Sequence, residues 1–171
     1  MAQKLVRFIE IEEFEKILTA EKDKKFKLAY VLGFGSGLRI SEIVGYKNLY
    51  KPLTKELISL EKHQIRIFGK GEKERITCTS PWLNKTNIEL LPLDIPRRTL
   101  QGRFTRLSKK ILNRSLSFHT LRHGFGNYMH NVKNVPLAVV QTLLGHSRID
   151  TTGVYTKANP VNAVERAWES F

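Results

Sequence analysis

Residues 118–132 have the sequence FHTLRHGFGNYMHNV, and the spacing of their apolar side chains is typical of a helix. His119 and Arg122 are three residues apart, so a helix would present both on one face. A histidine can accept a proton, and a guanidinium can hold two phosphate oxygens at once. The pair therefore indicates phosphodiester chemistry, although a helix with polar surface residues would explain this motif when it is taken alone.

The same motif contains a second spacing, because His119 and His123 are four residues apart, as zinc ligands are on the helices of metalloproteases. The residue after His119 is Thr120, where that mechanism needs a glutamate base, and the sequence offers no evident acidic third ligand. Phosphoryl chemistry is therefore the better interpretation. We expect neither a metal ion nor a small-molecule cofactor.

A second polar cluster, LLGHSRIDTTGVYT, covers residues 143–156 and follows an expected helix over 136–144. His146 precedes Tyr155 by nine residues. A tyrosine is most often a core aromatic, but the neighbours of Tyr155 are small or polar, as in Gly153 and Thr156. This setting favours an accessible phenol.

The rest of the chain predicts one domain that is mainly α with a small antiparallel β-sheet (α+β). Helical spacing predicts further helices over residues 11–18, 26–34, 97–112 and 160–171, and a short helix that begins after Arg39. Alternation of β-branched and polar side chains predicts three strands, over residues 56–61, 64–69 and 75–80. The glycines and lysines of 69–73 predict a hairpin turn between the last two strands.

Charge and composition indicate a polyanionic partner. The chain has 29 basic and 16 acidic residues, a formal net charge of +13, and the basic residues are spread from Lys4 to Arg166. Double-stranded DNA is the commonest strong polyanion, although ribosomal, membrane-surface and heparin-binding proteins are as basic. Cys78 is the only cysteine, which excludes an internal disulfide and fits a reducing compartment. No apolar run approaches the ~20 residues of a membrane span, so we expect a cytoplasmic protein with no membrane partner.

Four blocks, in this order, resemble the signature of tyrosine recombinases: GLRISEI around Arg39, IFGKGEKERI around Lys70, HTLRH, and LLGHSRIDTTGVYT. Together they span residues 37–156, which is most of the chain. The resemblance implies the catalytic-domain fold of this family and a DNA strand transferase that works through a 3′-phosphotyrosine. The family includes phage and archaeal viral integrases and chromosome-dimer resolvases, and the sequence leans toward the archaeal viral kind.

The resemblance implies six catalytic residues: Arg39, Lys70, His119, Arg122, His146 and Tyr155. The two arginines would hold the scissile phosphate, and Tyr155 would attack it with His119 as proton acceptor. Lys70 would protonate the leaving 5′-oxygen, a role for which Lys73 is the second candidate, and His146 would donate a hydrogen bond to the phosphate. Glu42 would either orient the other groups or be a solvated helix carboxylate.

The resemblance also implies double-stranded DNA as partner and a homotetramer on that DNA. Members of the family carry an amino-terminal DNA-binding domain, and we expect residues 1–171 to be a single catalytic domain without it. Two alternatives remain open. A type IB topoisomerase uses the same chemistry to nick and reseal one strand, and a non-catalytic DNA-binding module could share the fold.

Overall fold

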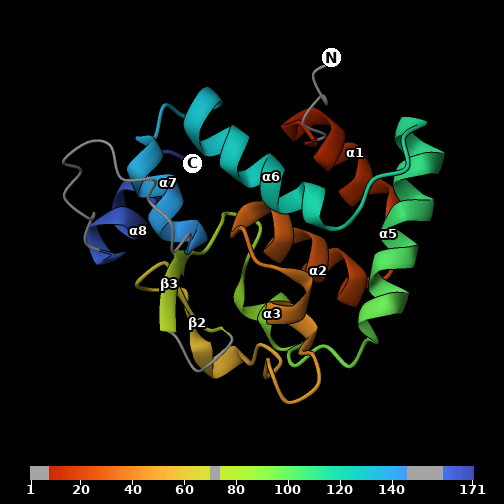
Figure 1. Cartoon of the computed structure of the whole chain (residues 1–171), viewed down its shortest axis with the longest axis horizontal. Coiled ribbons are helices and arrows are strands. Elements are labelled where there is room, and N and C mark those ends of the chain that lie inside the picture. The colour runs from red at the N-terminus through yellow and green to blue at the C-terminus, as the bar shows by residue number, and fades with distance from the viewer. Residues whose placement is uncertain (1–7, 70–73, 146–159) are drawn as a thin grey trace.

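The computed structural model describes residues 8–69, 74–145 and 160–171, and the described chain is mostly helical (Figure 1). The helices are α1 (Ile11–Ala20), α2 (Lys24–Gly35), α3 (Ile40–Val44), α4 (Lys85–Ile88), α5 (Arg97–Leu112), α6 (His119–Asn127), α7 (Leu137–Leu144) and α8 (Pro160–Glu169). A 3-10 turn, η1 (Lys55–Leu57), precedes the sheet, and a π-helical turn, η2 (Tyr128–Val132), prolongs α6. The predicted mainly α fold is confirmed.

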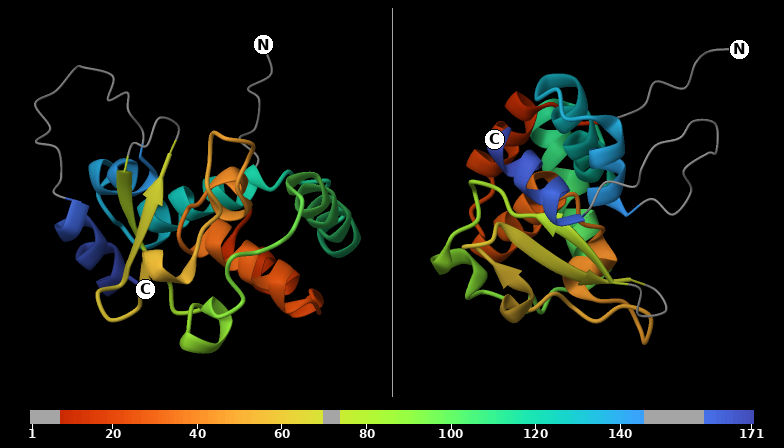
Figure 2. Two further views of the ribbon diagram at one scale, coloured as in Figure 1. Left: turned by 90° about the horizontal axis from the view of Figure 1, so that it is seen from below. Right: turned by 90° about the vertical axis from the view of Figure 1, so that its left-hand side faces the viewer.

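The sheet has three antiparallel strands in the order β1 (Ile58–Ser59), β2 (Gln64–Phe68) and β3 (Glu74–Cys78). Ile65 lies opposite Ile58 on one side and Thr77 on the other. The sheet, α7 and α8 lie at one end of the molecule and α5 lies at the other (Figure 2). The expected small antiparallel sheet is therefore confirmed.

The predicted strand over residues 56–61 is wrong in its extent. Only Ile58 and Ser59 pair with β2, because the chain before them forms η1 and the chain after them turns back at once. The His63 N–H donates to the Leu60 carbonyl at 3.3 Å, and His63 has a φ of 53°. The tight turn into β2 thus ends the strand where side-chain alternation alone would have continued it.

The core has two hydrophobic clusters, one on each side of the molecule. In the first, Phe14 of α1 stacks on Phe34 of α2 with ring centroids 4.1 Å apart, and α5 and α6 cover the other face of α2. The second cluster joins α7, α8 and the end of α6 through residues such as Phe125, Leu143 and Val164. The boundary between these clusters is where the polar site is found.

Helix α8 packs on its own domain, against α7 and β3 (Figure 2). The Trp168 ring stacks on the His63 ring with centroids 3.7 Å apart and an interplanar angle of 10°. In this structure the apolar face of α8 is covered by the chain to which it belongs.

Gly124 allows α6 to lie directly on α2 and on the segment before α1. A Cβ atom at this position would lie 2.7 Å from the Ile9 carbonyl oxygen and 2.8 Å from the Phe34 ring. The other glycine of α6, Gly126, has no such constraint, since its Cβ would meet the Leu144 side chain at an ordinary 3.5 Å. The cost of glycine in a helix is therefore explained by close packing at Gly124 and is unexplained at Gly126.

Gly124→Ala should destabilise the protein by about 1–3 kcal/mol, because the added methyl group meets a backbone atom that cannot rotate away. Gly126→Ala is the matched control. It should leave the free energy of unfolding unchanged or raise it by up to about 1 kcal/mol, because alanine favours the helix. Urea denaturation of both variants measures the difference, and equal effects at the two positions would contradict the packing role of Gly124.

Candidate active site

Arg39 is positioned by the turn that joins α2 to α3. Gly37 adopts a φ of +67°, and a Cβ atom there would lie 2.7 Å from the Phe125 ring, so the turn requires glycine. Arg39 then caps α3 with extended backbone angles, as the sequence predicted for a turn that enters a short helix. Its side chain is 39% exposed, which leaves the guanidinium accessible to a ligand.

Arg122 projects from α6 into the interior and is only 3% exposed. Its two terminal nitrogens donate to backbone carbonyls from separate elements, to Gly37 at 2.6 Å and to Leu144 at 2.5 Å. Burial lowers the pKa of Arg122 to about 9, and the nearby charges of Arg39 and Arg75 act in the same direction. The guanidinium is thus fixed in place and would be stabilised by an added anion.

Glu42 lies between the basic groups, with a side chain that is only 1% exposed. Its carboxylate accepts hydrogen bonds from the Arg39 backbone N–H at 2.7 Å, from the Arg39 guanidinium at 3.0 Å and from Arg75 at 2.8 Å. Burial acts to raise the pKa of Glu42, but the charge of Arg75 and the hydrogen bonds outweigh it and hold the pKa below its ordinary value. Burial rules out a solvated carboxylate and favours the orienting role.

Arg75 of β3 is the residue that sequence reasoning missed. One terminal nitrogen donates to Glu42, and the other donates to the Leu143 carbonyl at 2.5 Å. From the sequence, Arg75 was predicted only as the first residue of a strand. A signal was present, because Arg75 lies opposite the buried Ile67 and two positions before the buried Thr77, so strand alternation directs a charged side chain inward.

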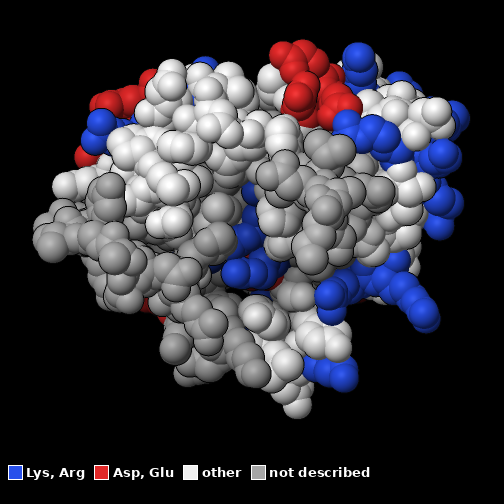
Figure 3. Space-filling model, turned by 45° about the horizontal axis from the view of Figure 1, so that its top comes forward, with Lys and Arg blue, Asp and Glu red and all other residues white. Residues whose placement is uncertain are grey.

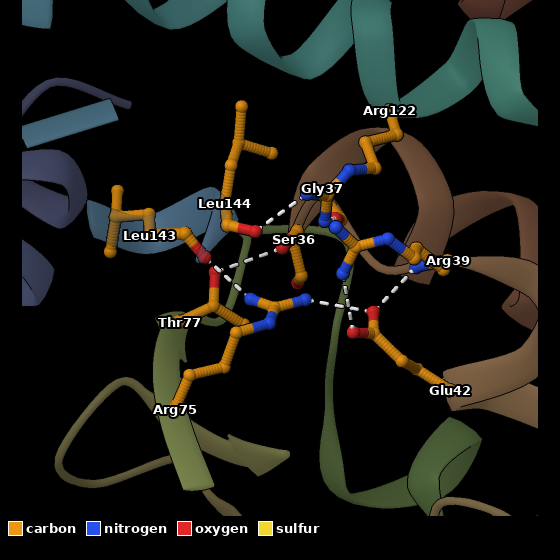
Figure 4. Close-up of polar contacts among 9 residues, drawn as sticks. All are labelled: Ser36, Gly37, Arg39, Glu42, Arg75, Thr77, Arg122, Leu143 and Leu144. Atoms are coloured by element: carbon orange, nitrogen blue, oxygen red, sulfur yellow. Dashed lines mark hydrogen bonds and ion pairs between the residues drawn. The ribbon is translucent and has the colours of Figure 1, made fainter. Parts of the chain in front are cut away.

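We call Arg39, Arg75 and Arg122 the arginine cluster; it surrounds the single carboxylate of Glu42 (Figure 4). Among the described residues, three guanidinium groups face one carboxylate, which leaves an excess of positive charge. Figure 3 shows basic side chains at the bottom of a hollow on one face of the molecule, and more of them along α5. Such a site attracts an anion with several oxygens, of which a phosphodiester is the most frequent in biology.

Of the other four predicted catalytic residues, the structure describes only His119. His119 is the first residue of α6, one turn before Arg122; its side chain is exposed, and its ring meets that of His123 edge to face at 4.4 Å. Burial and the Arg122 charge lower the pKa of His123. Lys70, His146 and Tyr155, with the second lysine candidate Lys73, lie outside the described residues. The structure thus brings Arg39 and Arg122 together and adds Glu42 and Arg75 to them.

The described residues hold no group of three or more histidine, cysteine, aspartate or glutamate side chains arranged to bind a metal ion. None of the helices in that part of the chain has the length and apolar character that a membrane crossing requires.

Glu42→Gln should lower the free energy of unfolding at pH 7 by about 3–5 kcal/mol, because it removes the buried partner of the arginines. A carboxylate whose pKa is lower in the folded than in the unfolded protein stabilises the fold at pH values above its unfolded pKa. This contribution is lost as the pH falls through the folded pKa. The difference between wild type and variant should therefore shrink below about pH 4.

Glu74→Gln is the control for this measurement, since Glu74 forms an exposed ion pair with Arg66 at 2.7 Å. That variant should cost less than about 1 kcal/mol. Urea denaturation between pH 3 and pH 8 gives both curves. Equal losses in the two variants, or a Glu42→Gln loss that does not change with pH, would contradict the electrostatic role of Glu42.

The chain is similar to known integrases and tyrosine recombinases. The model of the Phage integrase family matches residues 93–161. Tyrosine recombinase XerC of Histophilus somni is 31% identical over 176 residues, which cover 89% of this chain and 57% of that protein. Tyrosine recombinase XerD of Pseudomonas aeruginosa is 34% identical over 145 residues, which cover 72% of this chain and 46% of that protein. The chain thus spans about half the length of these relatives.

Solved structures share the fold. The integrase from mycobacterium phage Brujita matches with a TM-score of 0.69 at 20% identity, over 98% of this chain and 60% of that one. The XerH site-specific recombinase bound to its difH substrate matches with a TM-score of 0.59 at 24% identity, over 98% of this chain and 55% of that one. This chain is therefore similar in sequence to tyrosine recombinases and has the fold of their catalytic domain.

Proposed function

We propose that this chain is the catalytic domain of a site-specific tyrosine recombinase, which cleaves and rejoins DNA through a 3′-phosphotyrosine at Tyr155. The observation that carries the proposal is the arginine cluster around Glu42. Arg122 is held by two carbonyls and Arg39 by one carboxylate, so both guanidinium groups have fixed positions before any substrate arrives. Such preorganised positive charge is what a phosphoryl-transfer site needs.

In the proposed reaction, the Tyr155 oxygen attacks the scissile phosphorus while the bond from phosphorus to the 5′-oxygen breaks. His119 accepts the phenol proton, and Lys70 supplies a proton to the departing 5′-oxygen. Arg39 and Arg122, with a hydrogen bond from His146, bind the phosphate oxygens as their negative charge grows in the transition state. A 5′-hydroxyl from a partner strand then reverses these steps, so the phosphodiester energy is conserved and no cofactor is consumed.

Charge supports double-stranded DNA as the substrate. The net charge of +13 is accompanied by a helix, α5, that has six basic residues in the 16 from Arg97 to Leu112 and no acidic ones (Figure 3). The XerH structure with this fold contains its difH substrate, and the Tn1549 transposon integrase with this fold was solved in complex with circular intermediate DNA. We further propose that four copies assemble on two duplexes, because exchange breaks four strands and each copy offers one nucleophile. An intracellular site of action follows from this substrate.

Integration of a viral genome, with an archaeal virus as the source, is a prediction from the sequence blocks. We also propose that residues 1–171 form one catalytic domain that acts together with a separate DNA-binding part.

Wild-type protein should form a covalent protein–DNA adduct that survives denaturation. The substrate is a pool of nicked duplexes, in which cleavage releases a short strand. Tyr155→Phe should abolish the adduct, and Arg122→Ala should lower its yield by about 100-fold or more, because a fixed donor to the transition state is lost. Arg66→Ala, at an exposed strand position, is the control and should retain the yield. The adduct is counted on a denaturing gel.

Other outcomes of this assay separate the alternatives. A mobility shift without an adduct in wild type would reject the enzyme in favour of a DNA-binding module. An adduct accompanied by relaxation of supercoiled DNA by monomers would favour a type IB topoisomerase.

Adduct formation should also persist in EDTA, because two arginines and a lysine supply the positive charge and the proton that many nucleases obtain from magnesium. The rates with EDTA and with added magnesium should agree within about two-fold once ionic strength is matched. A strict requirement for a divalent ion would count against the proposed chemistry.

A further inference from the structure

The carboxyl end of α7 is held by two members of the arginine cluster. The last carbonyls of a helix have no partners within it and carry a partial negative charge. Here the Leu143 carbonyl accepts a hydrogen bond from Arg75, and the Leu144 carbonyl accepts one from Arg122. The end of α7 is therefore part of the surroundings of the cluster, although α7 contributes no catalytic side chain (Figure 4).

Arg75 has a place in this arrangement that no other described residue shares. It alone bonds both Glu42 and the end of α7, and so connects β3 to α3 and to α7. The space for it is built into the backbone, because Gly145 has a φ of +66° and a Cβ atom there would lie 2.4 Å from the Arg75 Cδ. The conformation of Gly145 and the position of Arg75 thus depend on each other.

We propose that Arg75 is a positioning residue for the phosphate-binding arginines. This inference rests on the proposed function and assigns the work of binding phosphate to Arg39 and Arg122. One terminal nitrogen of Arg75 bonds Glu42, which also holds Arg39. The other bonds the Leu143 carbonyl, next to the Leu144 carbonyl that holds Arg122. Arg75 keeps the Glu42 carboxylate and the Leu143 carbonyl at a fixed separation, and these elements in turn fix Arg39 and Arg122.

The shape of the guanidinium explains why an arginine occupies this position. Its planar fork presents two donors at a fixed spacing, which suits two acceptors from different elements. A lysine has one ammonium group on a flexible stem, so it can keep the charge next to Glu42 without holding both acceptors. Arg75→Lys therefore separates the electrostatic part of the role from the geometric part.

Arg75 also keeps Glu42 ionised. The charged groups that face Glu42 among the described residues are Arg39 from α3, Arg75 from β3 and Arg122 from α6, and Lys51 and Arg66 line the adjoining cavity. Of these, Arg75 makes the largest contribution to the low pKa of the carboxyl. Without Arg75 the pKa of Glu42 should rise, and in mildly acidic solution Arg39 would lose its ionised partner.

The test compares Arg75→Met and Arg75→Lys with Arg66→Met, a control on the neighbouring strand whose side chain is 56% exposed. Each variant is assayed below its melting temperature for DNA affinity and for the single-turnover rate of adduct formation against pH. Arg75→Met should lower the rate by about 10- to 100-fold and leave DNA affinity within about two-fold, because the phosphate is still bound but misplaced.

The pH profile gives the readout that a purely structural role would not move. In Arg75→Met the rate of adduct formation should begin to fall at a higher pH than in wild type. Arg75→Lys should restore the pH at which the rate falls, but only part of the rate itself. A folded Arg75→Met variant with the wild-type rate and pH profile would overturn the proposal. If Arg75→Met does not fold, the reduced rate is sought in Arg75→Lys alone, and a wild-type rate there overturns the proposal.

A second measurement separates failure of this inference from failure of the proposed function. Carbon-13 NMR of the glutamate carboxyls, with the Glu42 signal assigned through Glu42→Gln, follows the ionisation of Glu42 without any reaction. A raised Glu42 pKa in Arg75→Met supports the role of Arg75 even if wild type forms no adduct. An unchanged pKa rejects that role even if wild type is active.

Discussion

A single buried carboxylate among three guanidinium groups is the constraint on which the candidate active site depends. Glu42 is the acidic group within the arginine cluster, and without it three cations would share one poorly hydrated space. Moving charges out of water costs several kcal/mol per ion, so such a cluster persists only where hydrogen bonds compensate for the lost water. Backbone carbonyls and one carboxylate supply these bonds, and the remaining positive charge is available to a substrate anion.

The fold forms the arginine cluster by bringing together segments that are distant in sequence. The turn at Gly37, the strand with Arg75, the helix with Arg122 and the end of α7 meet where the two hydrophobic clusters adjoin. Close backbone approaches make the meeting possible, as at Gly37 and Gly124. Because the cluster is bonded to four elements, its geometry is a property of the packed domain and does not reside in any one motif.

Local signals allowed much of this to be predicted from the sequence. The glycines before Arg39 and the helical spacing around Arg122 act within a few residues, and α5 was predicted with its observed bounds. Arg75 was missed because its two acceptors lie 33 and 68 residues away in the chain. The strand at residues 56–61 was predicted too long because a turn closed by His63 overrides alternation. Burial of Glu42 similarly depends on partners from other elements, which left its role undecided.

The most direct test of the central claim is a structure of the Tyr155→Phe variant bound to an intact DNA site. The decisive quantity is the distance from the Arg39 and Arg122 guanidinium nitrogens to the non-bridging oxygens of one phosphate. We expect both arginines within hydrogen-bonding range of the same phosphate, about 2.7–3.0 Å, with Glu42 and Arg75 still paired behind them. A duplex bound on another face, with no phosphate within reach of either arginine, would contradict the account.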